Sequence, residues 1–203
     1  MFCIICGSRS FKDFRGRTNV HCAGCGSLER HRCFSLLTLD LIPELAGRRI
    51  HVLSSAARDM QLILRLFPEA FTVATPAALF AQERIDALFL RDDFEALAMP
   101  VDQFFQDVRR KISPGGVIAF TYSPSPEGAP YDFQKTEDPE GKPQLKIQFG
   151  PGATEWFKSL PDWNMSIWDP RVNFGAGADP KMGLRYNPNR VTSNRIVLAR
   201  PKV

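Results

Sequence analysis

Four cysteines near the start of the chain constrain its folding more than any other feature of the sequence. They form two Cys-x2-Cys pairs separated by 15 residues, and a glycine follows each pair. Two residues between thiolates let one short turn bring both sulfurs to a tetrahedral ion, and this double spacing is typical of zinc sites. A four-cysteine site has no open coordination position, which favours a structural role for the metal. We therefore expect one structural zinc ion, bound by Cys3, Cys6, Cys22 and Cys25.

Two other interpretations of these cysteines stay open at this stage, namely two disulfides, or reduced thiols without a metal. The sequence starts without the basic segment and apolar segment of a secretory signal, so we do not expect one. No stretch approaches 18 apolar residues, so a membrane-spanning helix is not expected either. Both observations favour the cytoplasm, where cysteines bind metal more often than they form disulfides. The fifth cysteine, Cys33, is expected to be a small buried apolar side chain.

The rest of the chain alternates between strand patterns and helix patterns. Its 203 residues, 44% of them hydrophobic, suit one α/β domain with a small appendage. Alternating strands and helices predict a parallel sheet with right-handed crossovers. Residues 123–152 are rich in proline and glycine, and we expect a long loop there. The expected strands are 49–53, 71–74, 86–90, 117–122, 163–168 and 195–199, and the expected helices are 27–41 (capped by Ser27), 56–67, 101–112 and 153–160.

The net charge of +4 is unevenly distributed along the chain. Residues 1–33 carry six basic and two acidic side chains, residues 171–203 carry seven basic and one acidic, and the segment between them is acidic. Four thiolates around one Zn²⁺ add two negative charges, which offset part of the basic character of the first segment. Aromatic side chains are not interleaved with its basic residues as they are on surfaces that stack nucleobases. The pattern therefore disfavours nucleic acid as a partner.

The residues from Cys22 to Arg32 read Cys-Ala-Gly-Cys-Gly-Ser-Leu-Glu-Arg-His-Arg. This string resembles that of a bacterial family in which a zinc ribbon is fused to a class I S-adenosylmethionine (SAM) dependent methyltransferase-like domain. Weaker matches lie at 49–53, 113–116, 136–139 and 149–150. The resemblance implies an α/β, Rossmann-like methyltransferase fold with an N-terminal four-cysteine zinc ribbon. It divides the chain into a ribbon (1–26), a connecting helix (27–47) and a methyltransferase-like domain (48–203).

The resemblance also implies SAM as a candidate cofactor, because ligands of open α/β sheets bind beyond the carboxyl ends of the strands. Structural alternatives stay open, such as a helix cap at Asp93, a buried core histidine at His51, and a ribbon interface or solvated face for the Arg-His-Arg run. The candidate cofactor-binding residues are Ser54, Ser55, Thr75, Arg91 and Asp92, and the candidate substrate-binding residues are Arg30, His31 and Tyr122.

The chain departs from the family pattern where the cofactor is expected. The turn Ser54–Ala57 has no glycine, the second strand leads to Thr75 without a carboxylate, and no histidine follows Phe149-Gly150. About ten residues separate the second and third strands, so one βα unit is expected to be shortened or lost. Two functions follow: a SAM-dependent methyltransferase-like zinc protein, active or degenerate, acting on a small-molecule or protein acceptor; and a non-catalytic binding or assembly protein on the same fold.

Overall fold

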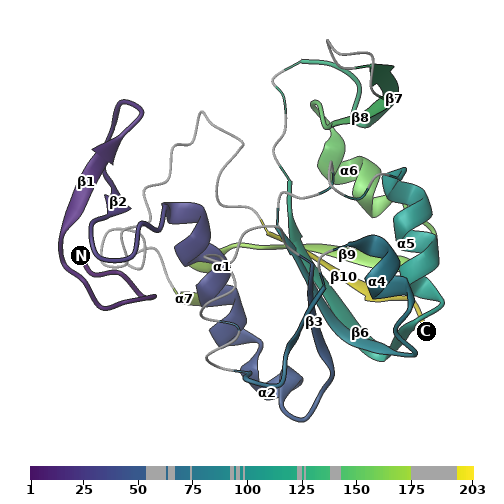
Figure 1. Cartoon of the computed structure of the whole chain (residues 1–203), viewed down its shortest axis with the longest axis horizontal. Helices are drawn as coiled ribbons and strands as arrows, with labels where there is room; N and C mark the ends of the chain where they lie inside the picture. Colours follow the sequence, from purple (N-terminus) through teal and green to yellow (C-terminus); the bar gives the residue numbers. More distant parts are fainter. Residues whose placement is uncertain are drawn as a thin grey trace. The chain divides into compact units, whose positions relative to one another are not determined.

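The computed structural model describes residues 1–53, 63, 67–73, 75–91, 94, 97, 99–122, 125, 127–137, 143–174 and 196–203. Most of the predicted helix 56–67 therefore lies outside the described residues. The chain divides into two compact units (Figure 1). The first contains Met1–Gly47 with the described parts of 56–69 and 167–196, and the second contains Arg48–Ser55, Ala70–Ser166 and Val197–Val203. Within the described residues, the longest apolar helix falls short of what a membrane crossing needs.

The second unit is built on a six-stranded sheet in the order β4-β3-β5-β6-β10-β9. The first four of these strands run parallel to one another, and β10 is antiparallel to β6. This arrangement confirms the predicted fold class. The strands are β3 (Ile50–Leu53), β4 (Phe71–Val73), β5 (Ile85–Arg91), β6 (Ile112–Thr121), β9 (Trp163–Trp168) and β10 (Ile196–Pro201).

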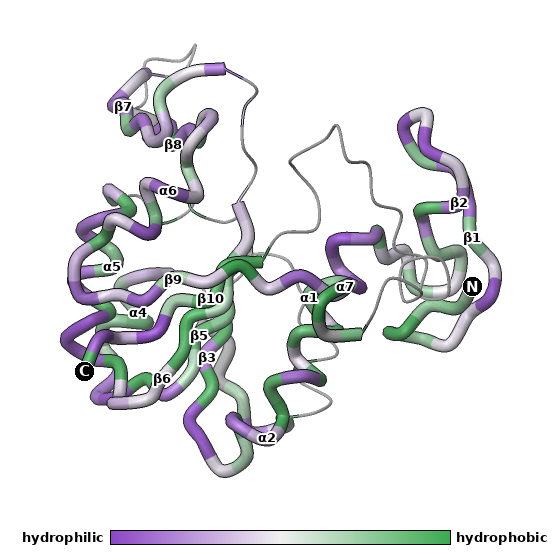
Figure 2. Tube along the Cα trace, turned by 180° about the vertical axis from the view of Figure 1, so that it is seen from behind, coloured by the Kyte–Doolittle hydropathy of each residue, from purple (hydrophilic) through white to green (hydrophobic). Residues whose placement is uncertain are grey.

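The sheet is apolar because its central strands are buried on both faces. All six residues from Ile85 to Leu90 are buried, and so are the residues of β3. Figure 2 shows the central strands as largely hydrophobic, and the buried polar exceptions are His51 and Asp86. Apolar runs without regular polar alternation are typical of parallel strands covered on both sides. This is why these strands could be predicted from the sequence.

Three helices lie on one side of this sheet, namely α4 (Pro76–Phe80), α5 (Val101–Arg109) and α6 (Ala153–Lys158) (Figure 1). The helix α4 was not predicted. It is a single turn, begun by the Thr75 hydroxyl, which accepts the N–H of Ala78 at 3.2 Å. One short turn joins β4 to β5, so this connection is as compact as the ten-residue spacing indicated.

An aromatic cluster fixes α5 and α6 to the sheet. Its centre is Phe157, whose side chain is fully buried. Ring centroids lie 4.9 Å from Phe120 on β6, 5.1 Å from Tyr122 and 6.2 Å from Phe105 on α5. Because this one side chain of α6 contacts both the sheet and α5, the cluster is the packing core of this side of the unit.

The prediction of a loop across residues 123–152 is wrong in part. The segment contains a two-stranded antiparallel hairpin, β7 (Asp132–Glu137) and β8 (Pro143–Gln148), in which Asp132 pairs with Gln148 (Figure 1). The strand pattern is hidden because β7 is exposed or half-buried along its length and so lacks a buried apolar face. At its base, Gly150 approaches the backbone closely: a Cβ there would lie 2.4 Å from the Ala129 carbonyl oxygen.

A buried carboxylate, Asp86, joins the starts of three strands. Its side chain accepts hydrogen bonds from the backbone N–H of Arg49 (3.0 Å), from Nε of Arg84 (2.8 Å) and from the Ser113 hydroxyl. Burial raises the pKa of Asp86, but these three partners outweigh it and lower the pKa below its ordinary value. The carboxylate therefore stabilises the fold above the ordinary pKa of about 3.9, and this contribution is lost as pH falls through the lowered value.

We expect Asp86→Asn to lower the free energy of unfolding at pH 7 by about 1–3 kcal/mol, because the amide replaces one of the two acceptor oxygens with a donor NH2 group and removes the negative charge beside Arg84. The difference from the wild type should shrink as pH falls below about 4, where the wild-type carboxyl also becomes neutral. Urea unfolding at several pH values measures this. Glu155→Gln, at a side chain that is 73% exposed, serves as the control and should change stability by less than about 0.5 kcal/mol. A constant difference at all pH values would contradict the assignment.

The first unit begins with a small antiparallel hairpin, β1 (Phe11–Phe14) and β2 (Arg17–Cys22), followed by α1 (Glu29–Asp40), α2 (Ile42–Leu45) and α7 (Pro170–Phe174). The predicted start of the helix at Ser27 is corrected, because Leu28 is the N-cap. The indole N–H of Trp168 donates to Asp40 at 2.8 Å, which ties the end of α1 to the segment before α7.

Candidate functional site

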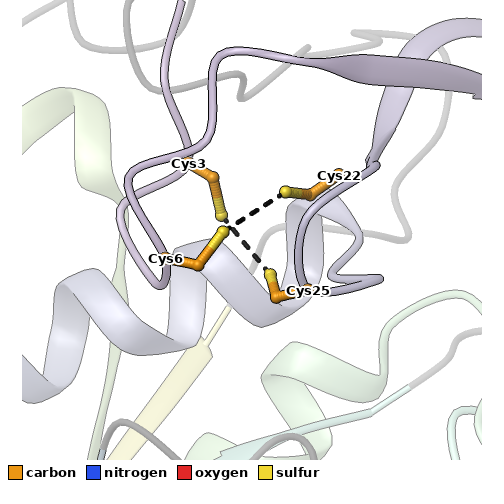
Figure 3. Close-up of side chains that lie close together, drawn as sticks. All are labelled: Cys3, Cys6, Cys22 and Cys25. Carbon is orange, nitrogen blue, oxygen red and sulfur yellow. Dashed lines mark hydrogen bonds between the residues drawn. The ribbon is translucent and has the colours of Figure 1, made fainter.

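The four predicted metal ligands come together in the first unit. The Sγ atoms of Cys3, Cys6, Cys22 and Cys25 all lie within 4.8 Å of one another (Figure 3). Cys3 lies 3.7 Å from Cys25, and Cys6 lies 3.6 Å from Cys22, so the short contacts join sulfurs of different pairs. Because these distances exceed an S–S bond of about 2.05 Å, the four groups are thiols.

Each cysteine pair sits in a turn that the sequence dictates. The N–H of Gly7 donates to the Cys3 carbonyl at 2.7 Å, and the N–H of Gly26 donates to the Cys22 carbonyl at 2.9 Å. Both glycines have φ above 70°, a conformation that glycine adopts without steric cost. The two Cys-x2-Cys-Gly segments therefore form the same type of turn, and the four sulfurs of the two turns face one another.

Backbone N–H groups also point at the sulfurs. Those of Ile5 and Cys6 donate to Cys3, and those of Gly24 and Cys25 donate to Cys22. Burial raises the pKa of Cys3 and raises that of Cys6 to about 12, whereas in Cys22 these donors and the neighbouring thiols outweigh burial and lower the pKa to about 7. Donors aimed at sulfur favour the thiolate, which is the form that binds metal. Four thiols in this arrangement fit a tetrahedral site for a thiophilic ion such as Zn²⁺.

Exposure differs among the four sulfur residues. Cys3 and Cys22 are fully buried, Cys25 is half-buried and Cys6 is exposed. The cluster therefore lies at the surface of its unit, with the first cysteine of each pair directed inward. A closed four-thiolate set gives no room for a substrate at the metal.

The polar residues that follow the cysteines belong to the start of α1. Nδ1 of His31 accepts the N–H of Leu28 at 3.1 Å and so caps the helix. The other ring nitrogen, Nε2, lies 3.2 Å from Nε of Arg30. Arg30 is exposed on the helix surface. Their assignment to substrate binding stays a prediction, and His31 has a structural duty in the first unit.

In the sequence, the candidate cofactor residues come just after a row of paired residues that crosses the sheet of the second unit. Register pairs Val73 with Leu53, Leu53 with Leu90 and Leu90 with Phe120. The chain runs from β3 outward to β4 and then returns to the other side of β3 at β5. Such a reversal is the topological switch point of an open α/β sheet, beyond whose carboxyl ends ligands bind. Each residue predicted to bind SAM lies one or two sequence positions after a residue of this row.

The structure describes only some of the candidate residues. Ser54, Ser55 and Asp92 lie outside the described residues, as does Asp93, and of Arg91 only the backbone, paired with Thr121, is described. The hydroxyl of Thr75 is engaged as the cap of α4. Tyr122 is 7% exposed, and its hydroxyl lies 2.7 Å from that of Thr154. His51, weighed as a buried core histidine, is 1% exposed on β3.

A separate cavity of about 570 Å³ runs along α5 in the second unit. It is lined by residues of α5, by the turn 159–163, and by Tyr131 and Trp156, whose rings stack at 4.2 Å. The Tyr131 hydroxyl accepts the N–H of Val101 at 2.9 Å. Because the cavity extends to Arg109 and Arg110 at the far end of the helix, it is distinct from the row that ends β3 and β5.

Sequence reasoning missed two buried polar residues beside the thiols, Ser27 and Arg32, which are 5% and 0% exposed. It also missed the buried pair of Glu29 with Arg17, joined at 2.5 Å. The signal that could have found Ser27, Glu29 and Arg32 is their closeness in the sequence to Cys25, the last of the four cysteines.

No protein-family model matches the chain, and no curated protein matches it significantly. Among solved structures, it is similar to a SAM-dependent methyltransferase from Mesorhizobium loti, with 14% identity, a TM-score of 0.50, and 81% of this chain and 96% of that chain covered. The CcbJ methyltransferase from Streptomyces caelestis has 13% identity and a TM-score of 0.47 over 86% and 90% of the chains. DhpI, solved with S-adenosylhomocysteine (SAH), has 18% identity and a TM-score of 0.39 over 81% and 72%. The likeness to the first protein shows a methyltransferase-type fold.

Proposed function

We propose that this protein is a zinc-containing, SAM-dependent methyltransferase-like protein. The four cysteines hold a structural zinc ion, and SAM binds at the carboxyl edge of the sheet, beyond β3 and β5. The observation that carries the proposal is the reversal of strand order between these two strands, with Leu53 and Leu90 paired at the edge. The Mesorhizobium loti methyltransferase, with the same type of fold, is named as SAM-dependent. We place the protein in the cytoplasm, where thiols stay reduced and available to metal.

In this proposal the cofactor residues have distinct duties. SAM, when bound, supplies an electrophilic methyl group. The turn Ser54-Ser55 offers backbone N–H groups and hydroxyls beyond β3, and Arg91 and Asp92 offer charged groups beyond β5. The backbone at Thr75 borders the same edge, since the hydroxyl is used by α4.

We assign acceptor binding in the second unit to Tyr122, which is held by Thr154 and orients an acceptor at the end of β6. In the first unit, Arg30 and His31 are candidates to bind an anionic group. Holding the acceptor close and in line accounts for most of the catalysis in such a site. The acceptor is a small molecule or a protein; nucleic acid and membrane are not part of the proposal.

Isothermal titration calorimetry of the zinc-loaded chain with SAM and with SAH tests the cofactor assignment. We expect binding with a Kd in the micromolar range, or about −8 kcal/mol. Ser54→Tyr should abolish binding, because a large side chain would fill the turn beyond β3. Ser166→Tyr is the matched control, at an exposed position on β9, and should bind as the wild type does. A folded, zinc-loaded wild type that releases no heat with either ligand would overturn the assignment.

A non-catalytic binding or assembly protein on the same fold is the second candidate. Two candidate hydroxyls already have hydrogen-bond partners within the protein, which favours this function. The hydroxyl of Thr75 caps α4, and that of Tyr122 bonds to Thr154. This function is also favoured by the sequence after β3, where no glycine lets the backbone approach a cofactor. The absence of SAM and SAH binding in the titration above would support this second function.

A further inference from the structure

Arg32 on α1 is a fully buried arginine beside the thiol cluster. It is 0% exposed. Its Nη1 donates to the Ser27 carbonyl at 2.8 Å and its Nη2 donates to the Val20 carbonyl at 3.0 Å. The guanidinium also lies over the ring of Phe11, with 5.0 Å between its Cζ and the ring centroid. Carbonyls and a ring face hold the group in place, but a buried full charge also needs a negative partner.

The negative groups around Arg32 are the sulfurs and one carboxylate. Burial lowers the pKa of Arg32, and the groups that act against this are Cys3, Glu29, Cys22 and Cys25. Of these, the carboxylate of Glu29 is 2% exposed and also pairs with Arg17 at 2.5 Å. An arginine is always charged in a protein, so the thiolates share the balance of this charge with Glu29.

Ser27 connects the guanidinium to the sulfurs. Its hydroxyl oxygen lies 3.4 Å from Nη1 of Arg32, 3.4 Å from Sγ of Cys3 and 3.2 Å from Sγ of Cys25. A metal-bound thiolate has no proton, so the hydroxyl donates to sulfur and accepts from Arg32. The dipoles then align from the guanidinium through the hydroxyl to the thiolate, an arrangement that strengthens each bond.

We propose that Arg32 is a positioning residue of the metal centre: it is the buried countercharge that tightens metal binding, acting through Ser27 and through its field on the thiolates. The inference rests on the proposed zinc site. One divalent ion with four thiolates carries a net charge of −2, and Arg32 neutralises part of it from the inner side of the cluster. Metal binding and the burial of the first turn of α1 are thereby coupled.

Zinc affinity, measured by competition with a chromophoric chelator, tests this inference. We expect Arg32→Met to weaken zinc binding roughly 10- to 100-fold, as is usual for partners just outside a ligand set. Arg32→Lys keeps the charge and should lose less. The matched control is Arg9→Met, which removes the same charge from an exposed position of the ribbon and should change the affinity less than twofold.

The metal-free chain gives the second readout. If Arg32 acts as a countercharge, Arg32→Met should destabilise the zinc-loaded protein in urea and leave the chelator-treated protein as stable as the wild type, or more so. A merely structural arginine would destabilise both forms equally and leave the zinc affinity unchanged, and that result would overturn the inference. If Arg32→Met does not fold, Ser27→Ala is measured instead, with Ser35→Ala as control. A several-fold loss of affinity only at Ser27 supports the inference, and equal affinities overturn it. A wild-type chain that takes up no zinc contradicts the proposed metal site itself, which separates the two failures.

Discussion

Replacing Cys22 with serine is expected to abolish zinc binding and to unfold the hairpin of β1 and β2. Cys22 is fully buried, and its sulfur lies within 4.8 Å of the other three. A serine hydroxyl is not a thiolate and cannot complete the tetrahedral set. Since the site does not exist in the unfolded chain, the metal's binding energy, on the order of 10 kcal/mol, is folding energy for this part of the protein.

Elemental analysis and limited proteolysis measure the effect of Cys22→Ser. We expect about one zinc per wild-type chain, since one ion takes four thiolates, and near-zero zinc in the variant, together with rapid cleavage within residues 1–28. Cys33→Ser is the matched control, because it makes the same atomic change at a buried cysteine outside the cluster and should keep the metal. A Cys22→Ser protein with full zinc content would show that the metal is bound elsewhere.

Replacing Phe157 with alanine is expected to cost the second unit about 3–5 kcal/mol of unfolding free energy. The ring is fully buried and lies between Phe120 on the sheet and Phe105 on α5. Removing it leaves a cavity that rings held by a helix and a sheet can fill only in part. Loss of these edge and tilted ring contacts adds to the loss of buried area.

Urea unfolding followed by tryptophan fluorescence measures this cost. Lys158→Ala is the matched control on the same helix. Its ion pair with Glu155 is exposed, with 45% and 73% of the two side chains accessible, and such pairs contribute at most about 1 kcal/mol. A Phe157→Ala protein as stable as the control would mean that the aromatic cluster is not the packing core.

Local patterns made part of this protein predictable. The cysteine spacing predicted which four sulfurs meet, because a Cys-x2-Cys turn needs only its own residues and the glycine after it. The strands at 86–90 and 117–122 were predicted because buried parallel strands form continuous apolar runs. The structure extends the first strand by one residue at each end, to Ile85–Arg91, and begins the second strand five residues earlier and ends it one residue earlier, at Ile112–Thr121.

Features that depend on distant partners were missed. The hairpin of β7 and β8 has no buried face that would mark it in the sequence, since its pairing is with itself. The start of α1 was misplaced because a serine before a helix usually caps it, whereas Ser27 turns its hydroxyl toward two sulfurs. Arg32 was weighed only as part of the Arg-His-Arg run, as a substrate contact, a ribbon interface or a solvated face, and the thiols beside it come together only in the fold.

The position of β10 has a consequence for how the chain is assembled. This strand, the last one in the sequence, lies inside the sheet, between β6 and β9. During synthesis, the edges of β6 and β9 that pair with β10 therefore stay unpaired until residues 196–201 leave the ribosome. Pairings between such distant segments close slowly, and unpaired strand edges are prone to aggregate. A chain cut just before Ile196 would keep both edges open, and we expect it to aggregate more readily than the full chain.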